Sequence, residues 1–503
     1  MNELFSAPLP GPVQKEEILK ILPEAKEIGK LPPEFCGVEC DSRKVAKGSL
    51  FFAIPGFKQD GRQYVPDAIK KGATGVVTVN FGLESEVGWL VVPEIRTALA
   101  RVSHLAYHHP ADKLLLFGVT GTNGKSTVAF LMRDILKEAG LKPAVLGTIA
   151  YEFAGVSIPA WNTTPESLDL ARFFYNVSQR GGKAASMEVS SHALALGRVE
   201  EILFDVAVFT NLTRDHLDFH KTMEAYREEK LKLFTRHLKP SGKAVLNLDV
   251  PEFEFFSKLT KGKVFTYSAE HPTADLFAAH YRFTTEGTEI DFVFEGKKFS
   301  LKAQLVGPFN LQNLLAAAAA GLAHGFSVDT VRSALEKSPP VPGRVEQVKM
   351  GQPFVVVVDY AHTPDGIEQI LKLARFFKPK RVLVVFGCGG DRDKGKRPLM
   401  AQAAEKYADL IFLTSDNPRT EPPEQIIQET LFGFADRSKV RKIVDRKEAL
   451  FAMVEEAKEG DFLVSCGKGH ETYQQIGEKK FPFDDREVFR EALKKRGYAD
   501  GGN

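Results

Sequence analysis

Residues 114–127, with the sequence LLLFGVTGTNGKST, join an apolar run to a glycine-rich turn and the start of a helix. Apolar side chains then recur at helical spacing, at Val128, Leu131, Met132, Ile135 and Leu136. Gly140 follows them and suits the C-terminal cap of a helix. A strand, a tight turn and a helix in this order are typical of a parallel α/β sheet, which is the fold that we expect around this segment.

The turn itself has the composition of a phosphate-binding loop. Gly121 and Gly124 let backbone N–H groups approach a phosphate, and Lys125 supplies a positive charge. The strict P-loop pattern would place another glycine at Val119, so the loop departs from it. Seven consecutive residues are expected to contact a nucleoside triphosphate: Gly121, Thr122, Asn123, Gly124, Lys125, Ser126 and Thr127. ATP is favoured over GTP, because the chain contains no Asn-Lys dipeptide of the N-K-x-D motif that reads guanine.

The chain has 503 residues, which is too long for one hydrophobic core and favours about three domains. Three prolines and a glycine mark a linker within residues 336–346, and apolar strands alternate with helices on both sides of it. We therefore predict an α/β protein with three domains. They are a smaller N-terminal α/β domain (residues 1–105), a central P-loop domain with a mostly parallel sheet (106–338) and a C-terminal Rossmann-like, doubly wound domain (339–503).

The composition, 43% hydrophobic and 26% charged, is ordinary for a globular protein. A net charge of +2 argues against a nucleic-acid binder that relies on a basic face. No stretch approaches the ~20 apolar residues of a membrane span. Cys36 and Cys40 lack the second pair of ligands that a zinc site needs, so we expect buried free thiols. These features predict a cytoplasmic, soluble protein that binds no nucleic acid and does not insert into a membrane. We also expect it to be monomeric.

Polar residues follow the apolar strands at their carboxyl ends, which is where open α/β sheets bind ligands. Glu188 ends the run AASME, and Asp215 and His216 follow the run FDVAVF. Two sheets that each present such an edge predict a cleft between domains. Carboxylate and imidazole groups near a phosphate loop are candidate ligands for Mg²⁺ in phosphoryl chemistry.

Several longer motifs carry a family resemblance. TGTNGKS, NTTPE (residues 162–166), MEVSSHAL, NLTRDHLDFH and YREEKLKLF together resemble the central domain of the Mur ligases. FNLQN (309–313), PGRVE, VDYAHTPDG and FGCGGDRDKGKRPLM are similar to the following part of those enzymes, and DSRKVAKGSLFFAIPGFKQDG to their N-terminal part. The resemblance spans nearly the whole chain.

This resemblance implies ATP-dependent amide-bond formation during assembly of the peptide of bacterial peptidoglycan. ATP would be a co-substrate and Mg²⁺ the cofactor. Because DNPR is the signature of members that add diaminopimelate, the partners that it implies are UDP-N-acetylmuramoyl-L-alanyl-D-glutamate and meso-2,6-diaminopimelate. The D-glutamate γ-carboxylate would be phosphorylated by ATP, and an amine would then displace phosphate from the acyl phosphate.

The resemblance also implies roles for individual positions. The catalytic residues are Lys125, Glu188, His216 and Lys230, and the Mg²⁺ ligands are Ser126, Glu188, His216 and a carbamate formed on Lys230. Besides the phosphate loop, the positions around ATP are Asn313, Arg344, Asp359, Tyr360 and His362. The positions for the UDP-linked dipeptide are Ser42, Phe57, Lys58, Gln59, Thr163, Thr164, Ser190 and Arg198. The positions for diaminopimelate are Arg392, Asp416, Asn417, Pro418, Arg419, Gly467 and Glu471.

Lys230 and the segment Asp416-Asn417-Pro418 also have simpler interpretations. The sequence by itself places Lys230 on a solvated helix face. A lysine near Mg²⁺ can instead become a neutral amine that captures CO₂ and turns into an anionic ligand. Asp-Asn-Pro is ordinary turn chemistry. Asp416 and Asn417 can also accept from an ammonium group, while the Arg419 fork suits the carboxylate that distinguishes diaminopimelate from lysine.

Three alternative functions stay open at this point. The nearest is the version of the same ligase that adds L-lysine. Another is a related ligase such as a folylpolyglutamate synthetase, which the N-terminal region disfavours. The third, from a different class, is a non-catalytic P-loop protein that uses ATP as a switch.

Overall fold

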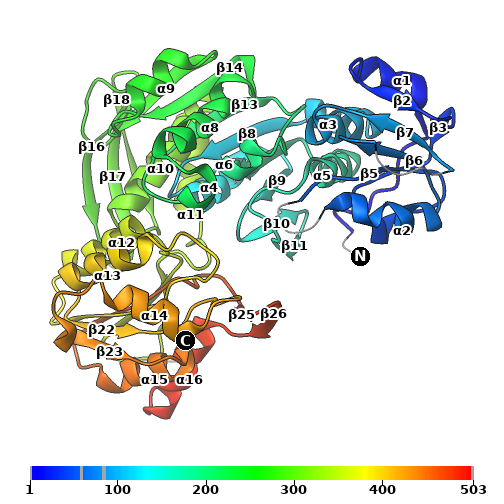
Figure 1. Ribbon diagram of the computed structural model, residues 1–503. Coiled ribbons are helices and arrows are strands. Elements are labelled where there is room, and N and C mark those ends of the chain that lie inside the picture. The colour runs from blue at the N-terminus through cyan, green and yellow to red at the C-terminus, as the bar shows by residue number, and fades with distance from the viewer. Residues whose placement is uncertain (1–2, 57–59, 82–85, 285, 500–503) are drawn as a thin grey trace.

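The structure is a computed structural model that describes residues 3–56, 60–81, 86–284 and 286–499. The chain forms three α/β bodies, and the central body lies between the N-terminal body, drawn in blue, and the C-terminal body, drawn in yellow to red (Figure 1). The predicted fold class is therefore confirmed. The boundaries at residues 105 and 338 stay predictions; the end of α11 at Lys337 and the start of β19 at Glu346 leave the predicted linker outside helices and strands.

The N-terminal body is a five-stranded sheet in the order β2-β7-β6-β5-β4, parallel except for β2. A two-stranded sheet pairs β1 with β3. Its strands are β1 (Val13–Gln14), β2 (Lys26–Ile28), β3 (Glu34–Phe35), β4 (Gly37–Glu39), β5 (Ser49–Phe52), β6 (Ala73–Thr78) and β7 (Gly88–Val91). Its helices are α1 (Lys15–Ile21), α2 (Val65–Lys70) and α3 (Ile95–Ala106). Cys36 in this body is exposed, so the expectation of a buried thiol was wrong there: it precedes β4 in a turn against Gly48.

The central body has one eleven-stranded sheet in the order β11-β10-β9-β12-β8-β13-β14-β15-β16-β17-β18. Pairing is parallel from β9 to β16, and antiparallel strands form both edges. Its strands are β8 (Leu115–Thr120), β9 (Pro143–Leu146), β10 (Ala150–Phe153), β11 (Val156–Pro159), β12 (Ala184–Glu188), β13 (Phe204–Phe209), β14 (Leu238–Asn247), β15 (Lys263–Ser268), β16 (Leu276–Phe283), β17 (Thr288–Phe294) and β18 (Lys297–Ala303). Its helices are α4 (Lys125–Glu138), α5 (Ser167–Gln179), α6 (Ser191–Ala195), α7 (Leu217–His220), α8 (Met223–Thr235), α9 (Phe253–Leu259), α10 (Pro308–His324) and α11 (Val328–Lys337).

The C-terminal body is a six-stranded sheet in the order β19-β20-β24-β21-β22-β23, parallel except for β19, with a separate hairpin of β25 and β26. Its strands are β19 (Glu346–Gln347), β20 (Val355–Asp359), β21 (Val382–Phe386), β22 (Leu410–Leu413), β23 (Val440–Lys442), β24 (Phe462–Cys466), β25 (Tyr473–Ile476) and β26 (Lys479–Pro482). Its helices are α12 (Pro364–Phe376), α13 (Lys396–Tyr407), α14 (Pro423–Leu431), α15 (Arg446–Glu456) and α16 (Asp485–Lys495).

Strand β21 shows why the apolar runs of this body are continuous. Val382, Val384 and Phe386 pack into one hydrophobic cluster, and Leu383 and Val385 pack into another on the opposite face. A parallel sheet that is covered on both faces requires apolar residues at every position of its inner strands. The predicted helix after the phosphate loop is confirmed as α4, with all five predicted apolar residues buried. Gly140, with φ of 77°, follows its C-terminus.

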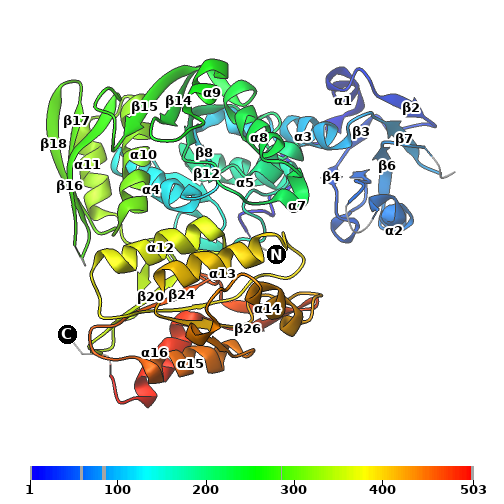
Figure 2. The same ribbon diagram turned by 60° about the vertical axis from the view of Figure 1, so that its left-hand side comes forward.

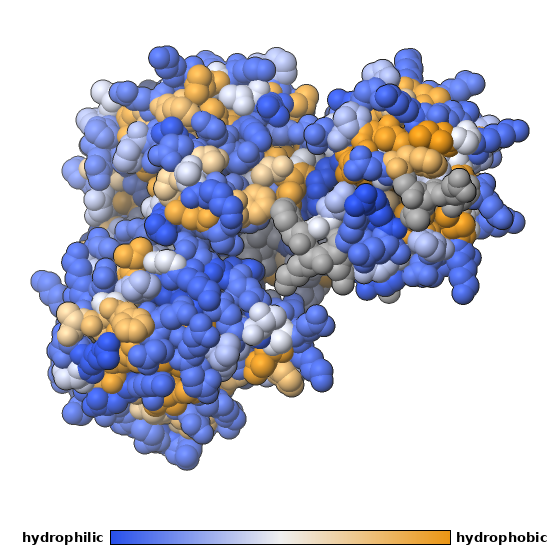
Figure 3. All heavy atoms as spheres, in the orientation of Figure 1, coloured by the Kyte–Doolittle hydropathy of each residue, from blue (hydrophilic) through white to orange (hydrophobic). Residues whose placement is uncertain are grey.

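The central body contacts the N-terminal body and the C-terminal body in different ways. Leu168 and Ala171 of α5 belong to the hydrophobic cluster of the N-terminal body, so those two bodies share a core. Helix α12 lies against the central body in both views (Figures 1 and 2). The surface seen in Figure 3 is mainly hydrophilic, with small, separate hydrophobic patches. No helix within the described residues is long and apolar enough to cross a membrane.

Candidate active site

A cavity of about 610 Å³ lies between the central and C-terminal bodies. Its size is that of a small-molecule site. Most residues predicted around ATP and Mg²⁺ line it, namely Thr122, Asn123, Gly124, Lys125, Ser126, Thr127, Glu188, His216, Lys230, Asn313, Arg344, Asp359, Tyr360 and His362. Residues separated by more than two hundred positions in the sequence thus meet where the sheet edges were expected to form a cleft.

The phosphate loop is held in shape by its own lysine and by two glycines. Nζ of Lys125 donates to the backbone oxygens of Gly121 at 2.9 Å and Thr122 at 2.8 Å. Gly124 has φ of 87°, and a Cβ there would collide with Oδ1 of Asn313. Burial lowers the pKa of Lys125, although the Glu188 carboxylate opposes the shift. The loop therefore presents a partly desolvated cation beside backbone that only glycine can adopt.

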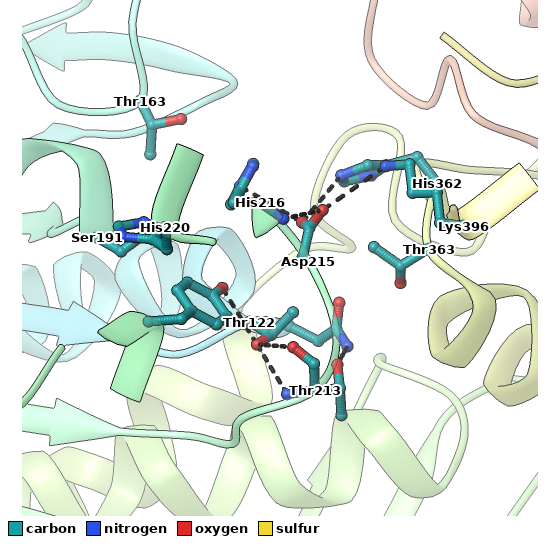
Figure 4. Close-up of polar contacts among 12 residues, drawn as sticks. Thr122, Thr163, Ser191, Thr213, Asp215, His216, His220, His362, Thr363 and Lys396 are labelled. Carbon is teal, nitrogen blue, oxygen red and sulfur yellow. Dashed lines mark hydrogen bonds and ion pairs between the residues drawn. The ribbon is translucent and has the colours of Figure 1, made fainter. Parts of the chain in front are cut away.

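Asp215 joins the two bodies at the centre of the cavity (Figure 4). Its carboxylate lies 3.4 Å from Nε2 of His216, 3.8 Å from Nε2 of His362 and 3.6 Å from Nζ of Lys396. Burial alone would raise the pKa of Asp215, but His216, Lys396 and His362 hold it below its usual value. The sequence singled out Asp215 as a polar group but did not assign Lys396, whose only signal was its place in the motif GDRDKGKRP.

Glu188 is buried at the end of β12. Its Oε1 accepts a hydrogen bond from the backbone N–H of Thr148 at 2.7 Å, and its Oε2 lies 3.3 Å from Oγ1 of the same residue. Gly147 has no side chain that would fill this space, because a Cβ there would meet the Glu188 carboxylate. The loop 147–148 thus fixes the direction of a carboxylate at the cavity wall.

His216 precedes α7 with φ of 54°, a left-handed conformation that is uncommon outside glycine. Its ring packs edge-on against His192, with centroids 4.7 Å apart. Burial lowers the pKa of His216 well below 6.5, despite the neighbouring Asp215 carboxylate. The ring is therefore neutral at physiological pH and has a lone pair for a metal ion or a hydrogen-bond donor.

Lys230 is buried, so its placement on a solvated helix face was wrong. Its Nζ donates to the backbone oxygen of Gly121 at 2.7 Å and lies 4.4 Å from the ring centre of Tyr226. Burial, and secondly Lys125, lower the pKa of Lys230 well below 10.5. A depressed pKa raises the fraction of the lysine that is a neutral amine, which is the form that reacts with CO₂.

Four of the eight residues expected to hold the dipeptide form one network beside Glu188, namely Thr163, Thr164, Ser190 and Arg198. Oγ1 of Thr164 donates to the Glu188 backbone oxygen at 2.8 Å and accepts from the Ser190 N–H at 3.1 Å. Arg198 donates to the Thr164 oxygen at 3.0 Å. Oγ1 of Thr163 lies 3.0 Å from Oγ1 of Thr148. Ser42 is buried in the N-terminal body and does not line the cavity, and Phe57, Lys58 and Gln59 fall outside the described residues.

Polar contacts bridge the cavity from the C-terminal body. Nη2 of Arg344 lies 3.2 Å from Oγ of Ser126, and its guanidinium carbon lies 4.8 Å from the Tyr360 ring centre. Asp359 accepts from the backbone N–H groups of Val345 and Ala361, both at 2.8 Å. Burial raises the pKa of Asp359 and lowers that of His362 to about 4.

A second bridge involves His470, which the sequence did not single out. Its Nε2 lies 3.2 Å from the backbone oxygen of Thr148. Because Thr148 also binds Glu188, the loop after β24 reaches the edge of the central sheet directly. The sequence GKGHE around His470 contains no pattern that could have predicted its contact with Thr148, which lies 322 positions away in the chain.

The residues expected to bind diaminopimelate lie in the loops after β22 and β24, except Arg392, which is exposed in the loop between β21 and α13. Asn417 Nδ2 donates to Oε2 of Glu471 at 2.9 Å. Arg419 has φ of 52°, and its Nη1 donates to the Gly390 oxygen at 2.8 Å. Gly467, with φ of 108°, leaves room for Asp416, whose Oδ2 would lie 2.9 Å from a Cβ.

The charges of this region are partly desolvated. Burial raises the pKa of Glu471, whereas Lys468 and Arg446 hold the pKa of the buried Asp416 carboxylate below its usual value. Burial and the neighbouring Arg392 lower the pKa of Arg419. Pro418 is buried between Asn417 and Arg419 and restricts the backbone there. Lys468, a buried lysine that the sequence did not single out, lies among these residues.

One further set of potential metal ligands includes Asp249 and Glu270, which line the same cavity. Within the described residues, Asp249, Glu270 and His271 each offer one ligand atom, and these three atoms lie within 4.8 Å of one another. Asp249 is already used: it accepts from the Ala269 N–H and from Gln312, both at 2.8 Å. The predicted set of Ser126, Glu188, His216 and Lys230 includes a hydroxyl and an amine, and it stays a prediction.

Comparisons with known proteins agree with these features. Models of three families match successive parts of the chain: the Mur ligase family catalytic domain over residues 34–104, the Mur ligase middle domain over 119–321 and the Mur ligase glutamate ligase domain over 343–469. UDP-N-acetylmuramoyl-L-alanyl-D-glutamate–2,6-diaminopimelate ligase of Solibacter usitatus is 45% identical over 469 residues, covering 92% of this chain and 94% of that protein.

Solved structures give the same result. A structure of a UDP-N-acetylmuramoyl-L-alanyl-D-glutamate–2,6-diaminopimelate ligase has a TM-score of 0.68 and 35% identity, and it covers 97% of this chain and all of its own. MurF ligase from Thermotoga maritima in complex with ADP shares the fold, with a TM-score of 0.65, 19% identity and coverage of 92% and 98%. The chain therefore belongs to the Mur ligase family.

Proposed function

We propose that this protein joins meso-2,6-diaminopimelate to the D-glutamate γ-carboxyl group of UDP-N-acetylmuramoyl-L-alanyl-D-glutamate, with conversion of ATP to ADP and phosphate. The reaction extends the peptide of a peptidoglycan precursor. The observation that carries the proposal is the contact between His470 and Thr148. It joins the loop that contains Gly467 and Glu471 to the loop that orients Glu188, so an amine held by the first loop can reach a carboxyl group activated beside the second.

The first step is phosphoryl transfer. A carboxylate oxygen of the D-glutamate attacks the γ-phosphorus of ATP, the bond from that phosphorus to the bridging oxygen of ADP breaks, and an acyl phosphate forms. Lys125 and the loop N–H groups stabilise the charge on the transferred group, and Arg344 approaches it from the other side of the cavity. The chain thus acts mainly by placing reactants and by preorganised charge.

The second step forms the amide. An amine of diaminopimelate attacks the acyl carbon, giving a tetrahedral intermediate from which phosphate leaves and the nitrogen loses a proton. His216 and Glu188 lie at the wall of the cavity where this intermediate forms, and the neutral ring of His216 can accept that proton or bind a metal ion. No serine or cysteine nucleophile takes part.

The residues at the phosphate loop fit Mg²⁺. The ion prefers oxygen ligands, and Ser126 and Glu188 present a hydroxyl and a carboxylate to the cavity. The buried, neutral amine of Lys230 would form a bond to the carbon of CO₂ and lose one proton, which adds a further carboxylate-like ligand. When bound, Mg²⁺ supplies positive charge that offsets the charge on the transferring phosphoryl group.

The amino acid is selected by its far carboxylate. Arg419 offers a planar fork to a carboxylate group, and its partly buried position makes an unpaired guanidinium costly. L-lysine would leave this fork without a partner. We further propose that the reaction takes place in the cytoplasm without nucleic acid and that one copy of the chain carries it out. Size-exclusion chromatography at assay concentrations tests the monomeric state.

The test is phosphate release measured with ATP, Mg²⁺, the UDP-linked dipeptide and a panel of amino acids. We expect release only when the dipeptide and meso-diaminopimelate are both present. Release that is equally fast with L-lysine would identify the lysine-adding version of the ligase. Release that needs neither partner would favour a P-loop switch and would refute the proposal.

A further inference from the structure

Lys396, the first residue of α13, is a buried lysine with no role in the chemistry proposed above. Only 8% of its side chain is exposed. Three lysines are buried in the part of the chain that the structure describes. Nζ of Lys230 donates to one backbone oxygen and Nζ of Lys468 to three acceptors, whereas Nζ of Lys396 has no hydrogen-bond partner within the described residues. Burial of an ammonium group without hydrogen-bond acceptors is costly, so this group is suited to a ligand that brings oxygen atoms.

The Lys396 ammonium group faces the carboxylate of Asp215 on the central body (Figure 4). Nζ lies 3.6 Å from Oδ1, which makes an ion pair but is too long for a hydrogen bond. Asp215 itself lines the cavity and acts on the phosphate loop: burial lowers the pKa of Lys125, and Asp215 is one of two carboxylates that oppose this shift. The C-terminal body thus places a cation directly beside the cavity, next to a carboxylate that the phosphate loop also senses.

A second ion pair of opposite direction joins the same two loops. Nη2 of Arg214 on the central body lies 3.5 Å from Oδ2 of Asp393 on the C-terminal body. Gly395 permits this approach, because a Cβ there would lie 2.8 Å from Nη2 of Arg214. The Gly395 N–H also donates to Oδ1 of Asp393 at 2.8 Å. These contacts fix the loop before α13, and they direct the neighbouring Lys396 toward Asp215.

The start of α13 adds positive potential at the same point. The helix has 12 residues, and Gly395 at its N-cap provides no side chain that would bind the first N–H groups. A helix N-terminus carries a partial positive charge and favours an anion. The helix end and the unbonded ammonium hydrogens of Lys396 together suit the charged oxygens of a phosphate group.

The phosphate group that fits this position is the phosphoryl group after its transfer. In-line displacement moves it away from ADP toward the carboxylate that attacks it. Lys125 is tied to the ADP side, because it is bonded to the backbone of its own loop. Asp215 lies toward the acceptor, since the ring of the adjacent His216 packs against His192, two residues after Ser190 of the dipeptide network. A cation beside Asp215 is therefore well placed for the transferred group.

We infer that Lys396 is a further catalytic residue, whose ammonium group binds the phosphoryl oxygens of the acyl phosphate while Asp215 keeps it in place. This inference rests on the proposed function and names a contact for its intermediate. In the second step the amine nitrogen forms a bond to the acyl carbon and loses a proton. The bond from that carbon to the bridging phosphate oxygen then breaks, and the departing phosphate keeps the electron pair. Lys396 stabilises the negative charge on this phosphate.

The first experiment traps the acyl phosphate. The protein, in excess over the UDP-linked dipeptide, is mixed with ATP and Mg²⁺ without an amino acid, and sodium borohydride then reduces the acyl phosphate to an alcohol that mass spectrometry detects. We expect Lys396→Met to yield at least ~10-fold less alcohol than the wild-type protein and to lower kcat of the complete reaction by about 10²-fold. Lys394→Met is the matched control, because Lys394 is exposed and pairs with Glu421; it should behave as the wild-type protein.

A binding experiment without turnover gives the second readout. Inorganic phosphate is titrated into the protein in the presence of ADP and the UDP-linked dipeptide. Lys396→Met should raise Kd for phosphate at least ~10-fold and change Kd for ADP by less than about twofold, because the lost contact is made only to the transferred group. A merely structural ion pair with Asp215 would weaken both ligands together. Should the methionine variant not fold, Lys396→Arg keeps the charge and should raise Kd for phosphate by a smaller factor.

The outcomes separate the two proposals. Undiminished trapping by Lys396→Met, an unchanged Kd for phosphate, or equal weakening of ADP and phosphate would overturn the role of Lys396 while the proposed function stands. A wild-type protein that yields no alcohol from the UDP-linked dipeptide would overturn the proposed acyl phosphate, and the inference with it.

Discussion

Nδ2 of Asn123 donates a hydrogen bond to Oδ2 of Asp365 at 2.7 Å, which connects the phosphate loop to the first turn of α12. The bond spans 242 positions of the chain and both walls of the cavity. A hydrogen bond to a charged group contributes about 1.5–3 kcal/mol, enough to shift an equilibrium between open and closed arrangements.

We therefore predict that Asp365→Ala opens the cavity between the central and C-terminal bodies. The radius of gyration from small-angle X-ray scattering should rise without substrates and return toward the wild-type value when ATP and the UDP-linked dipeptide are added. KM for ATP should rise by about 10-fold, in line with the bond energy above. Asp365→Asn keeps a hydrogen-bond acceptor, so its radius of gyration and its KM for ATP should lie between those of Asp365→Ala and the wild-type protein. Identical scattering curves for Asp365→Ala and the wild-type protein would show that this bond does not hold the arrangement.

Lys125→Ala should reduce kcat by at least about 10³-fold, because the transferred phosphoryl group loses its nearest fixed cation. The fold should persist, since the hydrogen bonds of this side chain within the described residues go to backbone oxygens of its own loop. Steady-state phosphate release measures the loss, and the thermal midpoint measures the fold. Lys137→Ala removes an exposed lysine from the same helix and is the control. A Lys125→Ala variant with near-normal phosphate release would refute the assignment of the loop.

Lys230→Ala should be nearly inactive and should recover part of its activity when formate or acetate is added, because a small carboxylate can replace the proposed carbamate. Lys232→Ala, two residues later on α8, should keep its activity, since that lysine is only partly buried and pairs with Glu229. In the wild-type protein, ¹³C-labelled bicarbonate should give a carbamate signal that Lys230→Ala lacks. The carbamate would be excluded by a fully active Lys230→Ala variant.

Arg419→Ala should lose most of the preference for diaminopimelate over L-lysine, by about 10²-fold or more, because the cation that receives the second carboxylate is gone. Nucleotide binding should persist, since Arg419 is outside the group of residues that line the nucleotide cavity. Competition between the two amino acids measures the preference, and binding of a fluorescent ATP analogue measures nucleotide binding. Arg419→Lys keeps the charge without the fork and should restore only part of the discrimination. A variant that discriminates as well as its parent would contradict the role of Arg419.

His104 should make the protein sensitive to acid. The side chain is buried, neither ring nitrogen has a hydrogen-bond partner among the residues that the structure describes, and burial lowers its pKa to about 3. The folded state therefore binds fewer protons than the unfolded state, whose pKa is 6.5, so the stability that depends on a neutral ring is complete above pH 6.5 and declines as the pH falls toward 3.

Replacement of this ring by a non-titrating one should remove that decline. His104→Phe should flatten the dependence of the chemical unfolding midpoint on pH between 7 and 5, whereas His108→Phe, at an exposed position on the following turn, should leave it unchanged. A wild-type midpoint that does not fall in this interval would contradict the prediction.

The parts of the site that lie close together in the sequence could be predicted from it. The phosphate loop and α4 follow from glycine spacing and a helical apolar face that the chain itself displays. Lys230 could not be placed in this way. Helix α8 also buries Tyr226, Leu233 and Phe234, and the lysine faces inward because its partner is the Gly121 oxygen, 109 positions away. A local pattern does not contain that partner.

The same limit explains the acceptors around Arg419. The residues Asp416 and Asn417 have the right chemistry for an ammonium group, and the sequence predicted them for that reason. Asn417 also contacts Lys468, which the loop after β24 supplies from 51 positions away. The strand-end rule for α/β sheets indicates which residues gather at an edge, but not which of them neutralise one another.

The hydrophobic core that α5 shares with the N-terminal body limits where the chain can be divided. Arg172 on α5 donates to Glu39 at 2.6 Å, to the Val38 oxygen at 3.1 Å and to the Tyr107 hydroxyl at 3.1 Å. A fragment cut after residue 105 would leave Glu39 without this cation and would bare the apolar side of α3. A chimaera that exchanges the N-terminal body between relatives should therefore place its junction after α5, so that the arginine and its three acceptors are inherited together.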